Sequence, residues 1–462
     1  MSALTQYIDL YREHGAVVGS HSCPAMNALR PRALETLENM TLPKKGAEHY
    51  ALTDLEELLA PDWGLNLAKV DIDVNPSRSF HCGVPMLSTS LFLFINDTFA
   101  ATPEACEGMP EGVFVGSMQA FARKMPEEFS RLYGSVADMA NPLVALNTLL
   151  AEDGMVVFVA DGVRLGKPLQ LVSILENGTP LMAVRRLLIV MGRDSEAKLL
   201  ACDHTQNPDV DYLSLQTVEI IAGAGSRLDY YDLEESTEKT RRLCSVYLEQ
   251  HEGSEVLLDG MTLYNGTTRN EYYCSHRGVG GRLRLLGMGV GDGRRRMETY
   301  SHVGHEVAGC HTDELFKYVV DDDAAASFEG MIYVAPGAVK TEAYQSNRNI
   351  VGSDTARMYS RPQLEIYNDD VKCSHGSAVG RLDAMQLFYM RTRGLPEATA
   401  RLLLKQAFMA DVIEGVRLKP LRERLHIMME RRFSGARPEC SSCQGYGCGE
   451  SDTDTDTDTE TL

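Results

Sequence analysis

One phrase recurs along the middle of this chain, and its first full copy is Gly225-Ser226-Arg227-Leu228-Asp229-Tyr230-Tyr231. A small residue opens a turn, and a run of alternating side chains follows it, as in a half-buried β-strand. Related phrases begin at three later points: Gly253-Ser254-Glu255-Val256-Leu257-Leu258, Gly280-Gly281-Arg282-Leu283-Arg284-Leu285-Leu286 and Ala325-Ala326-Ser327-Phe328-Glu329-Gly330-Met331. Such repetition, at an uneven period of about two to four dozen residues, indicates the stacked coils of a β-solenoid.

The same β texture extends over residues 145–367, with short alternating runs, frequent Gly, Asp and Asn, and hardly any helical period. Short strands separated by turns also suit a two-sheet sandwich. The pattern therefore favours a solenoid and leaves the sandwich open.

Helical spacing appears on both sides of this β segment. On the N-terminal side the chain is predicted to form helices at residues 4–14, 31–39, 53–59 and 116–132, with a strand or two at residues 88–96. On the C-terminal side, Asp383 is a plausible N-cap and Gly394 a plausible C′ residue of a first helix. Pro396 and Gly415 can bound a second, and residues 419–433 form a third.

Four regions follow from this division. They are residues 1–141, mostly helical; 142–376, the β core; 377–435, helical; and 436–462, a tail with a Thr-Asp repeat that cannot bury an apolar face and is expected to be disordered. At 462 residues the chain is too long for one ordinary core.

Charge and composition narrow the class of partner. The net charge is −20, and the tail contributes six of its acidic residues, so nucleic acid and anionic membranes are poor partners. No apolar run approaches the roughly 18 residues that a membrane span needs, and the first residues have no signal-peptide pattern, so a cytoplasmic location is expected. Eleven scattered cysteines indicate reduced, mostly buried thiols rather than a disulfide framework.

A possible metal or sulfur site lies where the β segment ends, in the stretch Pro362-Gln363-Leu364-Glu365-Ile366-Tyr367-Asn368-Asp369-Asp370-Val371-Lys372-Cys373-Ser374-His375-Gly376. Cys373 and His375 are two residues apart, so on an extended strand they share one face. A thiolate and an imidazole can bind one borderline or soft metal ion together. Taken alone, such a pair is more often a buried Cys beside an unrelated His.

The wording around this pair resembles the SufD family, the scaffold subunits of the SUF machinery that builds iron–sulfur clusters. The resemblance rests on Leu364-Glu365-Ile366-Tyr367, the run from Asp369 to Gly376, Val379-Gly380-Arg381-Leu382-Asp383, Leu387-Phe388-Tyr389 and Arg393-Gly394. It continues through Phe328-Glu329-Gly330-Met331-Ile332-Tyr333-Val334, Lys340-Thr341 and Gln345-Ser346-Asn347-Arg348-Asn349, and upstream through Leu146-Asn147-Thr148, Asp153-Gly154, Gly162-Val163 and Lys167-Pro168. Residues 141–432 are covered; the region before them matches loosely.

The resemblance implies a mainly β protein, with a right-handed parallel β-helix core flanked by N-terminal and C-terminal helical regions. It further implies a non-catalytic scaffold that pairs with a SufB-like subunit and binds a SufC-like ABC ATPase, where the ATPase activity resides. Cys373 and His375 would lie at the SufB contact and share a transient iron–sulfur cluster with it, two ligands being too few for a cluster that typically takes four. The chain need not hold a cluster at rest, and a homodimer is an option for the isolated chain.

The C-terminal helices would then carry a partner interface. The residues expected there are Leu387, Phe388, Tyr389, Arg393, Gly394, Leu402 and Phe408. Internal packing of a helical pair is the competing interpretation for about half of the apolar side chains in this region.

Two further groups of residues could bind metal. His302, His305, Cys310 and His311, followed by Lys317, form the densest His/Cys group, but their spacing matches no known zinc finger, so satisfied polar residues of the core are the favoured interpretation. Cys440, Cys443 and Cys448 form a C-x2-C-x4-C set in the tail that could wrap one soft ion, with idle surface thiols as the alternative.

An enzyme is the alternative to a scaffold, either a polysaccharide lyase on a β-solenoid or a Cys/His hydrolase. Solenoid enzymes that act on carbohydrates usually work outside the cell, and a hydrolase would need an orienting group and an oxyanion hole that the sequence does not reveal. There is no Gly-x-x-x-x-Gly-Lys-Ser/Thr loop for binding nucleotide phosphates.

Overall fold

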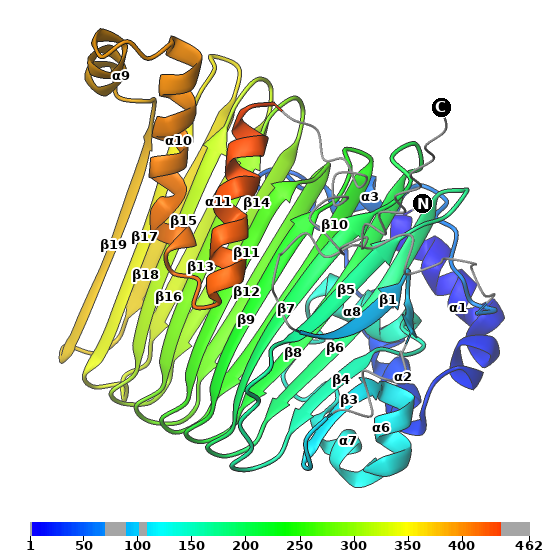
Figure 1. Cartoon of the computed structure of the whole chain (residues 1–462). Helices are drawn as coiled ribbons and strands as arrows, with labels where there is room; N and C mark the ends of the chain where they lie inside the picture. Colours follow the sequence, from blue (N-terminus) through cyan, green and yellow to red (C-terminus); the bar gives the residue numbers. More distant parts are fainter. Residues whose placement is uncertain (1, 70–88, 101–108, 436–462) are drawn as a thin grey trace, which may run out of the picture.

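A parallel β-solenoid forms the body of the protein (Figure 1). The computed structural model describes residues 2–69, 89–100 and 109–435. Successive strands alternate between two sheets, so each coil of the chain contributes one strand to each sheet. Sheet I has the order β19-β17-β15-β13-β11-β9-β7-β5-β1-β2, and sheet II has the order β18-β16-β14-β12-β10-β8-β6-β4-β3.

All pairs between coils are parallel, and the register advances by a nearly constant step. Glu255 pairs with Arg282, 27 residues on, and His311 pairs with Glu342, 31 residues on. A sandwich of hairpins would instead pair antiparallel strands. The prediction of a mainly β protein with a parallel β-solenoid core and helices at both ends is therefore confirmed, and the sandwich is excluded.

The strand bounds follow the recurring phrase, because each opening small residue forms the turn before a strand. In sheet I the strands are β1 Ser90–Ile95, β2 Thr98–Ala100, β5 Leu169–Leu175, β7 Glu196–Thr205, β9 Arg227–Glu235, β11 Glu255–Tyr264, β13 Arg282–Gly291, β15 His311–Val320, β17 Thr341–Val351 and β19 Val371–Gly380. In sheet II they are β3 Val113–Ser117, β4 Met155–Val159, β6 Leu181–Met191, β8 Tyr212–Ala222, β10 Thr240–Gln250, β12 Thr267–His276, β14 Arg296–His305, β16 Ala325–Val334 and β18 Arg357–Ile366.

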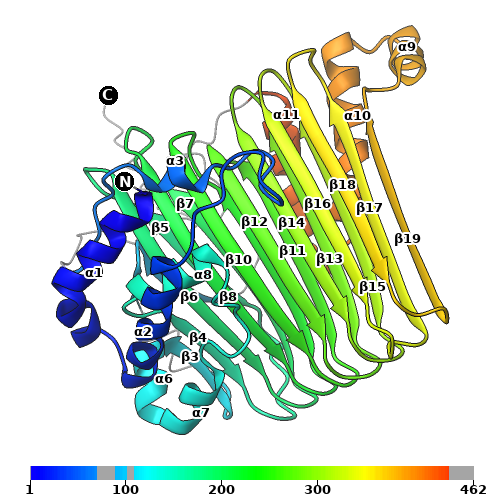
Figure 2. The ribbon, with the colours of Figure 1, turned by 180° about the vertical axis from the view of Figure 1, so that it is seen from behind.

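The N-terminal helices cover the outer face of sheet II (Figure 2). They are α1 Ala3–Ser20, α2 Pro24–Glu38, α3 Leu55–Leu59, α6 Met118–Lys124, α7 Pro126–Leu132 and α8 Pro142–Leu150. Carboxylates on that face hold the connecting segments: Glu298 accepts hydrogen bonds from the backbone N–H groups of Leu52 (3.1 Å) and Thr53 (2.8 Å), and Glu329 lies 2.7 Å from the His49 ring. Charge-assisted bonds of this kind fix the segment across several strands.

The C-terminal helices α10 Glu397–Ile413 and α11 Lys419–Phe433 lie on the outer face of sheet I, whereas α9 Ala384–Thr392 stands clear of it (Figure 1). Met409, Val412 and Met428 pack against buried side chains of that sheet. Lys317 of β15 is 3% exposed and donates to the Phe408 carbonyl at 2.7 Å and to Asp411 at 2.5 Å. These contacts fasten α10 to the solenoid.

Several helix boundaries differ from the sequence predictions. The second helix begins at Pro24 and runs through Pro31, where the sequence placed its start, because packing against α8 offsets the lost backbone hydrogen bond. The segment 116–132 divides at Pro126 into α6 and α7, and β1 begins at Ser90. Residue 88 lies outside the described residues.

The predictions for the C-terminal helices hold more closely. Asp383 caps α9 by accepting from the N–H groups of Met385 and Gln386, and Gly394 has the positive φ of +89° expected after its end. Pro396 is the N-cap of α10 rather than its first residue. Across the described ranges, none of the helices has the length and apolar character needed to cross a membrane.

Candidate functional site

The last coil of the solenoid, β18 and β19, is the edge of both sheets. Its inward-facing side chains have no further coil to cover them in the described structure. Ile366 of β18 is 39% exposed and Val379 of β19 is 49% exposed, although the matching positions of earlier coils are buried. We call this surface the open end. It consists of the inner faces of β18 and β19.

Cys373 and His375 lie on the open end, both pointing to the inner face of β19. Parallel pairing places Cys373 beside Ala343 of β17 and His375 beside Gln345. Cys373 is half-buried and packs in a small apolar cluster that includes Ile332 and Ala343, whereas His375 is exposed. Positions i and i+2 of a strand are about 6.6 Å apart, so the two side chains can reach one ion between them.

The last coil is held closed across its middle by two hydroxyl groups. The Oγ atoms of Ser360 on β18 and Ser377 on β19 are 2.6 Å apart, and Ser360 also donates to Asn347 Oδ1 at 2.6 Å. Ser377 lies two residues beyond His375 on the same face. The hydroxyl pair therefore marks the far limit of the site within the coil.

The environment of Cys373 keeps its thiol protonated. Burial raises the pKa of this thiol, and the backbone N–H of Ala343 only partly offsets that effect. The adjacent Lys372 points outward and pairs with Glu342 at 2.7 Å. A nucleophilic Cys needs the opposite, a lowered pKa, so this geometry does not suit the Cys/His hydrolase alternative. A metal ion can still displace the thiol proton on binding.

Cys373 and His375 are the only two members of their site that the described structure supplies. No group of three or more His, Cys, Asp or Glu side chains in residues 2–69, 89–100 and 109–435 could hold a metal ion. A cluster held by this pair therefore takes its other ligands from elsewhere.

The denser group of His and Cys residues is dispersed by the strands. His305 is buried inside the solenoid, where its Nε2 lies 2.9 Å from the Thr312 hydroxyl. His302 lies on the outer face of sheet II, His311 on the outer face of sheet I, and the Cys310 thiol faces the Gly278 carbonyl in a turn. Burial lowers the pKa of His305 to about 4, so its ring is neutral at physiological pH. These residues act as satisfied polar groups.

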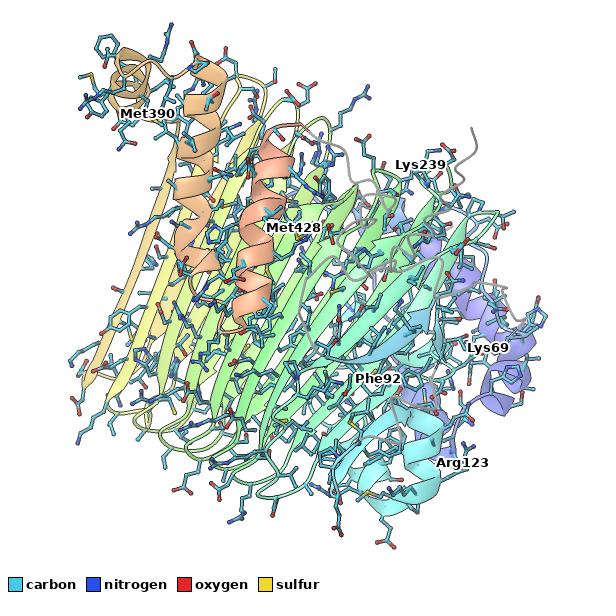
Figure 3. The ribbon with its side chains drawn as sticks, in the orientation of Figure 1. Lys69, Phe92, Arg123, Lys239, Met390 and Met428 are labelled. Carbon is cyan, nitrogen blue, oxygen red and sulfur yellow. The ribbon has the colours of Figure 1, made fainter. Side chains whose placement is uncertain are left out.

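The expected interface residues divide between α9 and α10. No residue of α9 is buried, and Met385, Phe388 and Tyr389 are 74%, 63% and 57% exposed. A shallow apolar groove runs between the two helices, lined by Met385, Gln386, Tyr389, Met390 and Leu404. In Figure 3, Met390 marks the helix that stands clear, and Met428 lies between α11 and sheet I.

The remaining expected interface residues make contacts within the chain. Leu387 and Leu402 are half-buried. Arg393 donates to the Tyr389 hydroxyl at 3.0 Å. Phe408 packs against Lys317, whose Nζ lies 4.7 Å from the ring centroid, so this side chain helps to attach α10 to the solenoid. Cys440, Cys443 and Cys448 lie outside the described residues.

Comparison with known protein families gives two matches that together span most of the chain. The SufBD protein N-terminal region matches residues 1–171, and the SufBD core domain of SUF-system FeS cluster assembly matches residues 174–408. The chain belongs to the SufBD family. The resemblance inferred from the sequence motifs is thereby confirmed.

Individual relatives agree with this assignment. An iron-sulfur cluster assembly SufBD family protein of Synechocystis is 28% identical over 90% of this chain and 92% of its own length. The iron-sulfur cluster assembly protein SufD of Escherichia coli is 25% identical over 88% of this chain and 93% of its own length, and that of Bacillus subtilis is 24% identical over 89% and 95%. The family belongs to iron–sulfur cluster assembly.

Two features of the site were not singled out from the sequence. Ser360 and Ser377 are ordinary residues whose pairing depends on which coil is last. Gln345 entered only as part of a family motif, and its place beside His375 depends on a register of about 30 residues. Writing the strands one above another at that period would have revealed both.

Proposed function

We propose that this chain is a non-catalytic scaffold subunit of the SUF machinery, which pairs with a SufB-like subunit through the open end and binds a SufC-like ABC ATPase on α9 and α10. One observation carries the proposal: the solenoid ends in two edge strands whose inner face holds both apolar side chains and the Cys373 and His375 pair. Exposed strand edges bind another strand readily, and proteins that do not use them usually cover them.

The partner subunit would complete both the fold and the site. Its own strands would extend sheets I and II, and its side chains would supply the ligands that Cys373 and His375 lack. The cluster is cargo in this scheme, assembled at the junction and then passed on. Binding of iron converts the protonated thiol of Cys373 to a thiolate with release of a proton.

The ATPase would act on the site through a short mechanical link. β19 ends at Gly380 and α9 begins at Ala384, so a protein that moves α9 also pulls the strand that carries Cys373 and His375. ATP-driven pairing of two ATPase subunits, one on each scaffold, would strain the junction and open it for loading or release. Phe388 and Met385, the most exposed apolar residues of α9, form the surface that we assign to this partner.

The experiment that tests this function is anaerobic affinity purification of the tagged chain from its own cells, with mass spectrometry of the co-eluting proteins and assays for iron and sulfide. Recovery of a SufB-like protein and an ABC-type ATPase is the expected result. Cys373→Ala and His375→Ala should lower the iron and sulfide content of the complex, and His311→Ala, at a half-exposed His on the outer face of sheet I, should not. A chain that purifies alone, without an ATPase, would contradict the proposal.

A further inference from the structure

A line of polar side chains runs through the solenoid interior to His375. Glu314 of β15, Gln345 of β17 and His375 of β19 occupy the same inward-facing position of three successive coils. Neighbouring strands are about 4.8 Å apart, so each side chain in this line stacks on the next. Glu314 and Gln345 are 0% and 3% exposed, whereas His375 is at the surface.

The two buried members have unused hydrogen-bonding capacity. The Gln345 amide Nε2 donates to Glu314 Oε2. Within the described part of the chain, Gln345 Oε1 and Glu314 Oε1 have no hydrogen-bond partner. A buried polar atom without a partner costs about 1–3 kcal/mol, and a native structure usually has a reason to retain one.

The fold makes room for Gln345 at this place. A Cβ atom on Gly330 of the facing strand β16 would come within 2.3 Å of Gln345 Nε2 and 2.9 Å of its Cδ. Gly330 has an ordinary φ, so the absence of a side chain there serves space rather than backbone conformation. The interior is thus shaped around the amide that stands next to His375.

We propose that Gln345 is a positioning residue for His375, whose ring N–H donates to the free Gln345 Oε1 once a partner covers the open end. The Gln345 N–H is engaged by Glu314 on the β15 side, which leaves the oxygen for the next member of the line. That bond fixes the ring orientation and the tautomer of His375, so its other nitrogen presents a lone pair to a divalent metal ion. A neutral amide achieves this without adding charge beside the cargo.

Outer-shell partners of this kind matter because a ligating His almost always donates its second N–H to a fixed oxygen. The inference rests on the proposed function, since it assigns His375 as a ligand. It adds that ligand geometry at the open end is set from inside the solenoid, by residues that never touch the metal ion.

The test uses the complex of the full chain with its SufB-like partner and ATPase, and Co2+ as the probe. Gln345→Met removes the amide at nearly constant volume, and we expect Co2+ affinity to fall about 10- to 100-fold. Gln250→Met is the matched control, because Gln250 is another 1% exposed amide with a free Oε1, in β10, distant from the site along the solenoid. A high-resolution structure of the wild-type complex should place Gln345 Oε1 about 2.7–3.2 Å from a His375 ring nitrogen.

Gly330→Ala is the second variant, because its Cβ displaces the Gln345 amide without changing the chemistry of that residue. It should reproduce the loss of affinity even if Gln345→Met folds poorly. Equal Co2+ affinity in wild type, Gly330→Ala and Gln345→Met, or a structure in which Oε1 and the ring are apart, would overturn the inference. His375→Ala separates the two proposals: if it leaves Co2+ affinity unchanged, the assigned ligand is wrong, and the distance in the complex alone decides the role of Gln345.

Discussion

The two ends of the solenoid are built differently. At the N-terminal end, the short antiparallel strand β2 covers the edge of β1, and β3 covers the edge of β4, so the inner residues Phe92 and Val115 are 0% and 5% exposed. At the C-terminal end, the described structure has no such cap, and Val379 and Ile366 on the inner face are exposed. The chain thus contains the means to close a solenoid end and uses it once. The open end is therefore a surface retained for another molecule.

The largest difference between the ends should appear in stability. Phe92→Ala removes a fully buried ring that lies 6.4 Å from Phe99 between ring centroids, and we expect it to lower the free energy of unfolding by about 3–5 kcal/mol. Val379→Ala, at the open end, should change it by less than about 0.5 kcal/mol. Urea denaturation followed by circular dichroism measures both. Equal losses at the two positions would show that the open end is as tightly packed as the capped one.

Partner binding should reverse this order of sensitivity. The double variant Ile366→Glu and Val379→Glu places two charges on the open end, where a partner would bury them unpaired at a cost of about 2–5 kcal/mol. Recovery of the SufB-like partner should then fall at least about 30-fold, with the free energy of unfolding of the isolated chain nearly unchanged. Ile427→Glu is the control, because Ile427 is 43% exposed on α11. A partner retained in full by the double variant would place the junction elsewhere.

The sequence predicted the capped and open regions with unequal success. Repeated turn-and-strand phrases revealed the parallel coils, because each coil meets the same local requirements of small turn residues and alternating strands. Which coil would be last and uncovered depends on where stacking stops, and no local pattern encodes that. The pair Cys373 and His375 was found from motif wording, whereas Gln345 and the Ser360–Ser377 bridge needed the register between coils.

The N-terminal region was the least predictable part for a similar reason. Its strand β1 pairs with β5, about 80 residues further along the chain, and its helices are fixed by contacts with sheet II. Pro31 reads locally as a helix start, yet α2 passes through it because the packing against α8 outweighs one lost hydrogen bond. Long-range contacts of this kind override local signals.

Covering a face also changes its titration, which gives a third contrast between sealed and open surfaces. Asp259 of β11 is 1% exposed beneath the α10–α11 turn, near Arg284 and Tyr231, and neither carboxyl oxygen has a hydrogen-bond partner among the described residues. Burial raises the pKa of this carboxyl to about 7. Between about pH 4 and pH 7 the folded chain therefore holds a proton that the unfolded chain has lost, so stability declines as pH rises through this window.

Asp259→Asn should remove that share of the decline. Between pH 5 and pH 8 the wild type should lose about 2–3 kcal/mol more than the variant, at about 1.36 kcal/mol per pKa unit. Urea denaturation at the two pH values measures the difference. Asp313→Asn, a half-exposed carboxyl on β15, serves as the control and should keep the wild-type dependence. The same slope in all three proteins would mean that Asp259 is ionised in the folded state.

The smallest expected effect concerns the bridge that closes the last coil. The Ser360 and Ser377 hydroxyls are 2.6 Å apart at the surface, so Ser377→Ala should lower global stability by only about 0.5–1 kcal/mol. Its local effect should be larger, because β18 and β19 have neighbours on one side only, and hydrogen exchange of their backbone amides should accelerate several-fold while exchange in β11 stays unchanged. Addition of the SufB-like partner should restore slow exchange in wild type and variant alike, since new strands would then hold the edge. If exchange in β18 and β19 is as slow as in β11 before any partner is added, the last coil is closed by contacts other than this bridge, and the contrast between the two ends is weaker than the exposed side chains indicate.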